Sequence, residues 1–202
     1  MTAILIVVIA IIIISGKQAG QLPAYLSVVD KMTQNSAMIE HKFYSKPFRC
    51  SLTRPDSTWI PQFENDPDSS KLLEEQPFTL VSLLKWDKKE LAARVELNLS
   101  RIPLSRTVEQ VALMDFTKRT ANYDNDKYEV IREVTQAGGV GIIGAYYVVD
   151  FSPETDKELP ILVSMFFVRK EIVYNLICSA TADSYDAYKT DFENILKNFA
   201  FY

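Results

Sequence analysis

Alternating and continuous runs of apolar residues divide most of this chain into predicted β-strands. In residues 91–100 the odd positions are apolar, and Arg94 and Glu96 stand at even positions. A period of two is typical of a strand that packs one face and leaves the other polar. Further stretches rich in β-branched and aromatic residues are bounded by turn-forming residues. The predicted strands are residues 48–53, 78–86, 91–100, 128–136, 140–151, 160–168 and 172–181.

Two stretches have the period of an amphipathic helix. The first begins at a cap, Ser105 or Thr107, and runs to about residue 122. The second follows Thr181 or Asp183 and carries one apolar, mostly aromatic face. That face consists of Tyr185, Tyr188, Phe192, Ile195, Leu196 and Phe199. We interpret it as a core stripe that packs on a sheet, because such stripes rarely form cofactor sites.

This order of elements predicts an α+β fold. Most strands follow one another through short polar turns, such as residues 87–90, so they should pair antiparallel. The two helices would then cover the sheet. We expect a central antiparallel β-sheet of about six to seven strands sandwiched by helices, in a domain of residues 43–202.

The N-terminal residues form an unbroken apolar run that predicts a hydrophobic helix. About fifteen helical residues cover roughly 22 Å, which is short of the roughly 30 Å of a bilayer core. A run of this length is typical of the apolar core of a signal peptide. However, no Lys or Arg precedes the run, and Lys17 stands where a cleavage site needs a small residue. We therefore expect residues 1–16 to be an uncleaved transmembrane anchor or signal-anchor, with cleavage as the alternative. Its apolar residues are Ile4, Leu5, Ile6, Val7, Val8, Ile9, Ile11, Ile12, Ile13 and Ile14.

Residues 17–42 are expected to form a helical linker between the anchor and the domain. Pro23 suits a first helical position, and Leu26 and Val29 begin a ragged apolar face. A partner-binding helix is the alternative interpretation.

The side of the membrane depends on few charges. Lys17 and Lys31 follow the apolar run, and the positive-inside rule taken literally would place the domain in the cytoplasm. We expect the domain on the extracytoplasmic (periplasmic) side and keep the cytoplasmic side as the alternative.

Composition removes several classes of function. The net charge is −4 and no basic stripe is present, so nucleic acid is not an expected partner. His41 is the single histidine, which leaves almost nothing for a histidine-bearing zinc site or a Ser-His-Asp triad. We expect no metal, no cofactor and no catalytic residue.

The two cysteines, Cys50 and Cys178, lie far apart in sequence in two predicted strands. They can be buried thiols that behave as small hydrophobic residues. The alternative is a disulfide that joins the first and last predicted strands, which requires neighbouring Cα atoms and an oxidising compartment.

Three motifs resemble ligand sites but have simpler interpretations. Residues 139–144, GVGIIG, fit GxGxxG, yet the dinucleotide fingerprint must open a helix, and AYYVVDF follows instead. We interpret these glycines as serving a turn and a close approach of a backbone or ring. The acidic residues of 61–70 lack the glycine and closing glutamate of an EF-hand, and residues 124–126 are turn formers.

Several motifs together resemble the PsbP/Mog fold, which includes DcrB-type lipoproteins and the Eag chaperones of type VI secretion. They are Pro55-x-x-x-Trp59, Gly144-Ala145-Tyr146 at the head of a strand, YNLICSA at residues 174–180, and Tyr188, Phe192 and residues 195–199 in the last helix. The resemblance covers about residues 48–199. It implies a non-catalytic protein that binds a protein or stabilises a membrane complex: PsbP-type proteins act on photosystem II, the Mog branch on the GTPase Ran, and Eag chaperones on transmembrane segments of effectors. No residue here matches a functional site of that family.

The expected function is therefore a non-enzymatic, membrane-anchored accessory subunit or protein-binding module that stabilises or assembles a membrane protein complex. Its partners would be a membrane protein and, through the N-terminal helix, the lipid bilayer. The alternative is an extracytoplasmic small-ligand or ion-binding protein that uses the sheet face near Trp59, Arg94 and Glu96. The third hypothesis is a hydrolase using Glu96 or Asp150, against which stands that nothing in the sequence places two carboxylates together.

Overall fold

The computed structural model describes Met32 and residues 34–63, 77–102, 106–121, 123–124, 127–139, 142–151 and 159–202. The predicted anchor at residues 1–16 and most of the predicted linker lie outside these residues. None of the helices in the described ranges is long and apolar enough to cross a membrane.

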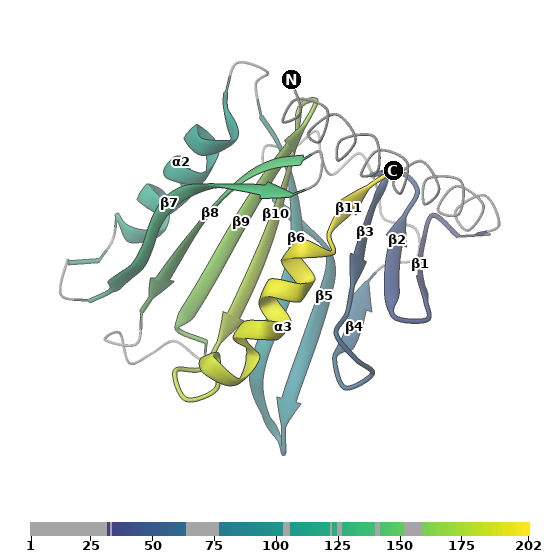
Figure 1. Ribbon diagram of the computed structural model, residues 1–202, viewed down its shortest axis with the longest axis horizontal. Helices are drawn as coiled ribbons and strands as arrows, with labels where there is room; N and C mark the ends of the chain where they lie inside the picture. Colours follow the sequence, from purple (N-terminus) through teal and green to yellow (C-terminus); the bar gives the residue numbers. More distant parts are fainter. Residues whose placement is uncertain are drawn as a thin grey trace, which may run out of the picture.

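A seven-stranded antiparallel sheet organises the molecule (Figure 1). Its order across the sheet is β4-β5-β6-β10-β9-β8-β7, so consecutive strands are neighbours except where β6 pairs with β10. Tight turns join β5 to β6 and β9 to β10, with Lys88 and Lys170 at positive φ. The strands are β4 Ile60–Phe63, β5 Phe78–Asp87, β6 Glu90–Arg101, β7 Glu129–Gly139, β8 Ile142–Asp150, β9 Ile161–Arg169 and β10 Ile172–Ala180.

A second, four-stranded sheet is absent from our sequence prediction. It has the order β1-β2-β3-β11, formed by β1 Ser36–Ile39, β2 Lys42–Ser45, β3 Cys50–Thr53 and β11 Ala200–Phe201. The predicted helical linker is therefore wrong over β1, which pairs with β2 in a hairpin, and the domain starts before residue 43. The short β11 pairs with β3, so the last residues of the chain close the sheet that the first described residues begin.

The helix α3, Tyr185–Lys197, and the small sheet cover one face of the large sheet. This face, the α3 face, holds one continuous core in which Leu97, Leu176 and Phe192 are fully or almost fully buried. Phe43 and Leu52 of the small sheet belong to the same core. The predicted stripe of the last helix thus packs on a sheet, as expected.

The helix α2, Val108–Thr120, lies on the opposite face and packs mainly on β7, β8 and β9. Thr107 caps it: its hydroxyl accepts from the Gln110 N–H, and the Gln110 side chain accepts from the Thr107 N–H. Ala112, Tyr147 and Val149 are fully buried in the smaller core beneath the helix. On this α2 face the helix leaves β5, β6 and β10 uncovered by any other described helix.

Gly144 explains the misleading glycine motif. It lies inside β8, and a Cβ added there would come within 2.9 Å of both the Phe166 carbonyl oxygen and the Phe167 ring. The predicted close approach of a backbone and a ring is confirmed at this glycine. The element that follows is a strand, which contradicts a dinucleotide fingerprint.

Candidate functional site

The part of the α2 face that the helix does not cover carries several polar side chains on β6 and β10. The even positions of β6 place Arg94, Glu96 and Asn98 on this face, and β10 contributes Asn175 opposite Asn98. The alternate residues of the same two strands, such as Leu97 and Leu176, point toward the α3 face. Because successive side chains of a strand point to opposite faces, one pair of strands builds both a core and a polar surface.

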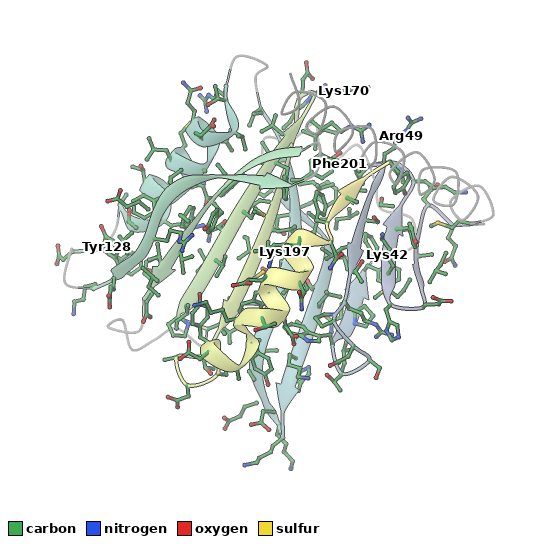
Figure 2. All side chains as sticks on the ribbon, in the orientation of Figure 1. Lys42, Arg49, Tyr128, Lys170, Lys197 and Phe201 are labelled. Carbon is green, nitrogen blue, oxygen red and sulfur yellow. The ribbon has the colours of Figure 1, made fainter. Side chains whose placement is uncertain are left out.

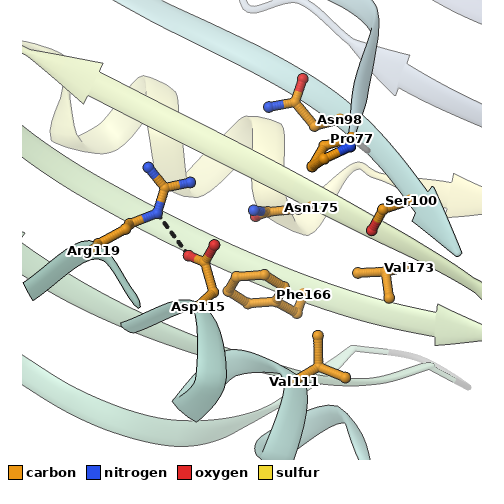
Figure 3. Close-up of a pocket in the computed structure, with 9 residues that line it drawn as sticks. All are labelled: Pro77, Asn98, Ser100, Val111, Asp115, Arg119, Phe166, Val173 and Asn175. Atoms are coloured by element: carbon orange, nitrogen blue, oxygen red, sulfur yellow. Dashed lines mark hydrogen bonds and ion pairs between the residues drawn. The ribbon is translucent and has the colours of Figure 1, made fainter. Parts of the chain in front are cut away.

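A cavity of about 140 Å³ lies where α2 meets this polar surface (Figure 3). The helix supplies one wall, and β6, β9 and β10 supply the floor and the other wall. Polar and apolar side chains share the lining. They are Pro77, Asn98, Ser100, Val111, Asp115, Arg119, Phe166, Val173 and Asn175.

Asp115 is the centre of the polar wall. Its Oδ2 accepts a hydrogen bond of 2.7 Å from the Arg119 Nε and one of 2.5 Å from the Tyr147 hydroxyl. Burial, together with the neighbouring charge of Asp115, raises the pKa of Tyr147, so the phenol stays a donor. Burial opposes the charged form of Arg119, but Asp115 outweighs it and the pKa of Arg119 is raised.

Two asparagines face this wall with their amide nitrogens as donors. Thr79 donates a 2.7 Å hydrogen bond to Asn98 Oδ1, and Ser164 donates a 2.9 Å bond to Asn175 Oδ1. With both carbonyl oxygens engaged, the Nδ2 groups have no acceptor among the described residues. The cavity thus brings together two amide donors and the outer nitrogens of Arg119.

Our sequence analysis did not single out Asp115, Arg119, Tyr147 or Asn175. Asp115 and Arg119 stand four residues apart on a predicted helix, a spacing that places them on one side. Nothing in the sequence sets that side against β6 and β10, however, because the packing of α2 is a tertiary contact.

Arg94 and Glu96, which we predicted to form an interaction surface, do lie together on the α2 face. Their closest charged atoms are 3.8 Å apart, and both side chains are partly exposed. The Arg94 Nε is buried and has no hydrogen-bond partner among the described residues. Neither residue lines the cavity, although Glu96 is two positions from Asn98 on the same strand.

Trp59, the third member of that predicted surface, is not at the surface. It is fully buried in the core of the α3 face, with ring centroids 6.0 Å from Tyr188 and 6.2 Å from Phe192. Its indole N–H donates to Asp191 of α3 at 3.1 Å. The prediction that Trp59 joins Arg94 and Glu96 is therefore wrong, because the large sheet separates them.

Cys50 and Cys178 are both free and fully buried. Cys50 lies in β3 and Cys178 in β10, and both belong to the core of the α3 face. Burial raises the pKa of each thiol. The structure therefore has the buried thiols of our first interpretation and not the disulfide.

Four cations lie at the end of the molecule where the described chain begins. We call this end, with Lys46, Arg49, Arg169 and Lys170, the basic end. The Lys46 ammonium donates to the carbonyl of Met32, and the Lys46 N–H to the carbonyl of Asn35 at 2.7 Å. Arg169 donates to the carbonyl of Arg49 at 3.5 Å, which holds the β9–β10 turn beside the β2–β3 turn. Figure 2 shows Arg49 and Lys170 at this common end.

Carboxylates are few in the described turns of the basic end, although Arg169 also donates to the Tyr202 oxygen at 3.4 Å. Glu171 is the one carboxylate in the two turns, residues 46–49 and 170–171, and it pairs with Arg101 at 2.7 Å. Arg49 and Lys170 are exposed. This end therefore presents positive charge on a chain whose net charge is −4.

No metal-binding cluster of three or more histidine, cysteine, aspartate or glutamate residues occurs within the described ranges.

Comparisons with known proteins give a likeness of fold. The chain matches no protein-family model, and no curated protein sequence matches it. Among solved structures it is similar to the solution structure of cyanobacterial PsbP (CyanoP) from Synechocystis sp. PCC 6803. The TM-score is 0.57 at 13% identity, over 82% of this chain and 95% of the other. The two antiparallel sheets and two helices described here therefore form a PsbP-like α+β fold.

Proposed function

We propose that this chain is a membrane-tethered, non-enzymatic accessory subunit that binds and stabilises a membrane protein complex. The observation that carries the proposal is the position of the basic end. The chain reaches the domain there, through Met32 and Asn35, after the apolar run of residues 3–14. A tether in the bilayer would therefore turn the cations toward the membrane surface.

Electrostatics supports this orientation where the leaflet that faces the domain is anionic. A lysine or arginine near an anionic membrane surface contributes about 1 kcal/mol, and the attraction falls off within the Debye length of about 8 Å. Exposed Arg49 and Lys170 stand at the end that the tether holds close to the headgroups. Tethering also raises the local concentration of the domain near a membrane partner, so a modest interface would suffice.

The PsbP-like fold gives independent but coarser support. The resemblance implies accessory roles on membrane complexes, and the structural neighbour shares the fold over most of both chains. We extend that role to this chain as part of the proposal, with a partner in the same membrane and the domain on its extracytoplasmic side.

The orientation can be tested with the full chain in lipid nanodiscs. Headgroups that carry a paramagnetic ion should broaden the amide signals of residues 169–171, near the basic end. The β5–β6 turn, residues 88–89, is the matched control because it also contains lysines and lies at the opposite end of the strands. Broadening at residues 88–89 instead, or at neither turn, would contradict the proposed orientation.

The accessory role is tested in native membranes. After mild detergent extraction and crosslinking, the full chain should migrate with a stoichiometric membrane protein, whereas a variant lacking residues 1–16 should be lost from the membrane fraction. Recovery of the full chain alone would contradict the accessory role. An alkaline phosphatase fusion at Tyr202, active outside the cytoplasm, reports the side: an inactive fusion would place the domain in the cytoplasm.

A further inference from the structure

We propose that the cavity between α2 and the polar sheet surface binds a small monocarboxylate with a short apolar or single-ring tail. This site goes beyond the accessory role, and it does not depend on the tether. Its donors come from two β-strands and one helix, and its apolar floor comes from a third strand and from β10.

The donor set selects an anion. Asn98 and Asn175 present amide N–H groups because Thr79 and Ser164 occupy their carbonyl oxygens. The Arg119 Nε donates its hydrogen bond to Asp115. The two outer nitrogens of the guanidinium can then bind both oxygens of a carboxylate in a bidentate contact.

Asp115 does not turn the site into a cation site. The Arg119 guanidinium neutralises its charge, and the Tyr147 hydroxyl donates to the same oxygen, Oδ2. Tyr147 is fully buried, so this contact fixes the carboxylate against the sheet. Asp115 thereby acts as a positioning residue that holds Arg119 at the wall of the cavity, and Figure 3 shows this ion pair.

The size and floor of the cavity limit the rest of the ligand. A cavity of about 140 Å³ is close to the roughly 150 Å³ that accommodates one benzene ring in an engineered protein core. Phe166, Val173 and Val111 supply the apolar part of the lining. A carboxylate attached to one ring or to a short alkyl chain fits both conditions.

Benzoate and butyrate are suitable probes, with benzamide as the neutral analogue of benzoate. The full chain in an uncharged detergent should show saturable amide and side-chain NMR shifts at Asn98, Asn175 and Arg119 with both carboxylates. Benzamide should produce none. Equal shifts with benzoate and benzamide, or no saturable shift with either carboxylate, would overturn the proposal.

Asn98→Asp keeps the shape of the side chain and introduces a like charge, so it should weaken benzoate binding about tenfold or more. The matched control is Asn194→Asp, the same change at an exposed position of α3 on the opposite face. Unchanged benzoate affinity in Asn98→Asp, with the fold intact by circular dichroism, would place the site elsewhere. Should Asn98→Asp fail to fold, the benzoate and benzamide comparison on the unmodified chain decides alone.

Discussion

On the α3 face of the large sheet, Leu97 and Leu176 are fully buried under a helix and a second sheet. Their sequence neighbours Asn98 and Asn175 point to the α2 face and line a cavity. The same two strands, β6 and β10, carry both rows. The difference lies in what packs on them: α3 contacts β6 and β10 on the α3 face, whereas α2 packs mainly on β7, β8 and β9. We therefore expect the larger core on the α3 face to contribute most to stability, and the proposed carboxylate site lies on the α2 face.

The largest test of this comparison removes an aromatic anchor from the α3 face. Phe192→Ala should lower the free energy of unfolding by about 3–5 kcal/mol, because it leaves a cavity beneath Trp59 and Tyr185. Chemical denaturation measures the loss. The control on the other side is Leu113→Ala, whose side chain is 55% exposed on α2 and should change stability by less than about 0.5 kcal/mol. Equal losses would contradict the assignment of Phe192 to a closely packed core.

Gly144→Ala tests how tightly the α3 face is packed where a strand has no side chain. The new methyl would lie 2.9 Å from the Phe166 carbonyl oxygen and the Phe167 ring, so we expect a loss of about 1–3 kcal/mol. Shortening the ring should relieve part of this clash. In denaturant melts the double variant with Phe167→Leu should lose less than the sum of the two single variants; strict additivity would argue against the ring contact.

Alkaline pH should weaken the α3 face through its two thiols. Burial raises the pKa of Cys50 and Cys178, so the folded state favours the neutral thiols while the unfolded chain ionises from about pH 8.5. Their contribution is therefore fully present below that pH and is lost above it, by about 1.5–2 kcal/mol per thiol at about pH 10. The free energy of unfolding, measured across this pH range, should fall less steeply in the Cys50→Ala, Cys178→Ala double variant. An unchanged fall would assign the effect to other groups, such as the buried tyrosines.

The smallest change in stability is expected on the α2 face. Tyr147→Phe removes the hydrogen bond to Asp115 but leaves the Arg119 pair, and it should cost about 1 kcal/mol. Tyr146→Phe is the control, because the neighbouring hydroxyl bonds to Arg132 at an exposed site and its loss should cost less than about 0.5 kcal/mol. Thermal unfolding of the two variants would contradict the structural role of the Tyr147–Asp115 hydrogen bond if Tyr146→Phe were the more damaging.

Strong local patterns were sufficient for the long elements. The alternation in residues 91–100 and the stripe of α3 both appear in the structure with the predicted faces. Thr107, one of the two residues predicted as a cap, caps α2. Short strands were missed: β1, β2 and β4 have four residues each and β11 has two, too few for a period to be visible. In β4, Pro61 also argues against a strand, and the structure accommodates it at the edge of the sheet.

The sites show the same division. Arg94 and Glu96 were predicted from alternation and do share a face, but Trp59 was added to them without any periodic link and lies on the far side of the sheet. Asp115, Arg119 and Tyr147 come together through the packing of α2 on β8 and β9, across about thirty residues of sequence.

By itself, the sequence determined which side chains of each long strand share a face, because that depends only on the period of two, and it determined the apolar face of α3 for the same kind of reason. It also determined the apolar N-terminal run and the PsbP-like order of the elements. Only the tertiary structure decided which face each helix covers, that α2 stops short of β6 and β10, and that the basic turns meet where the chain enters the domain. Those features depend on contacts between segments distant in sequence, and no local period records which segments will meet.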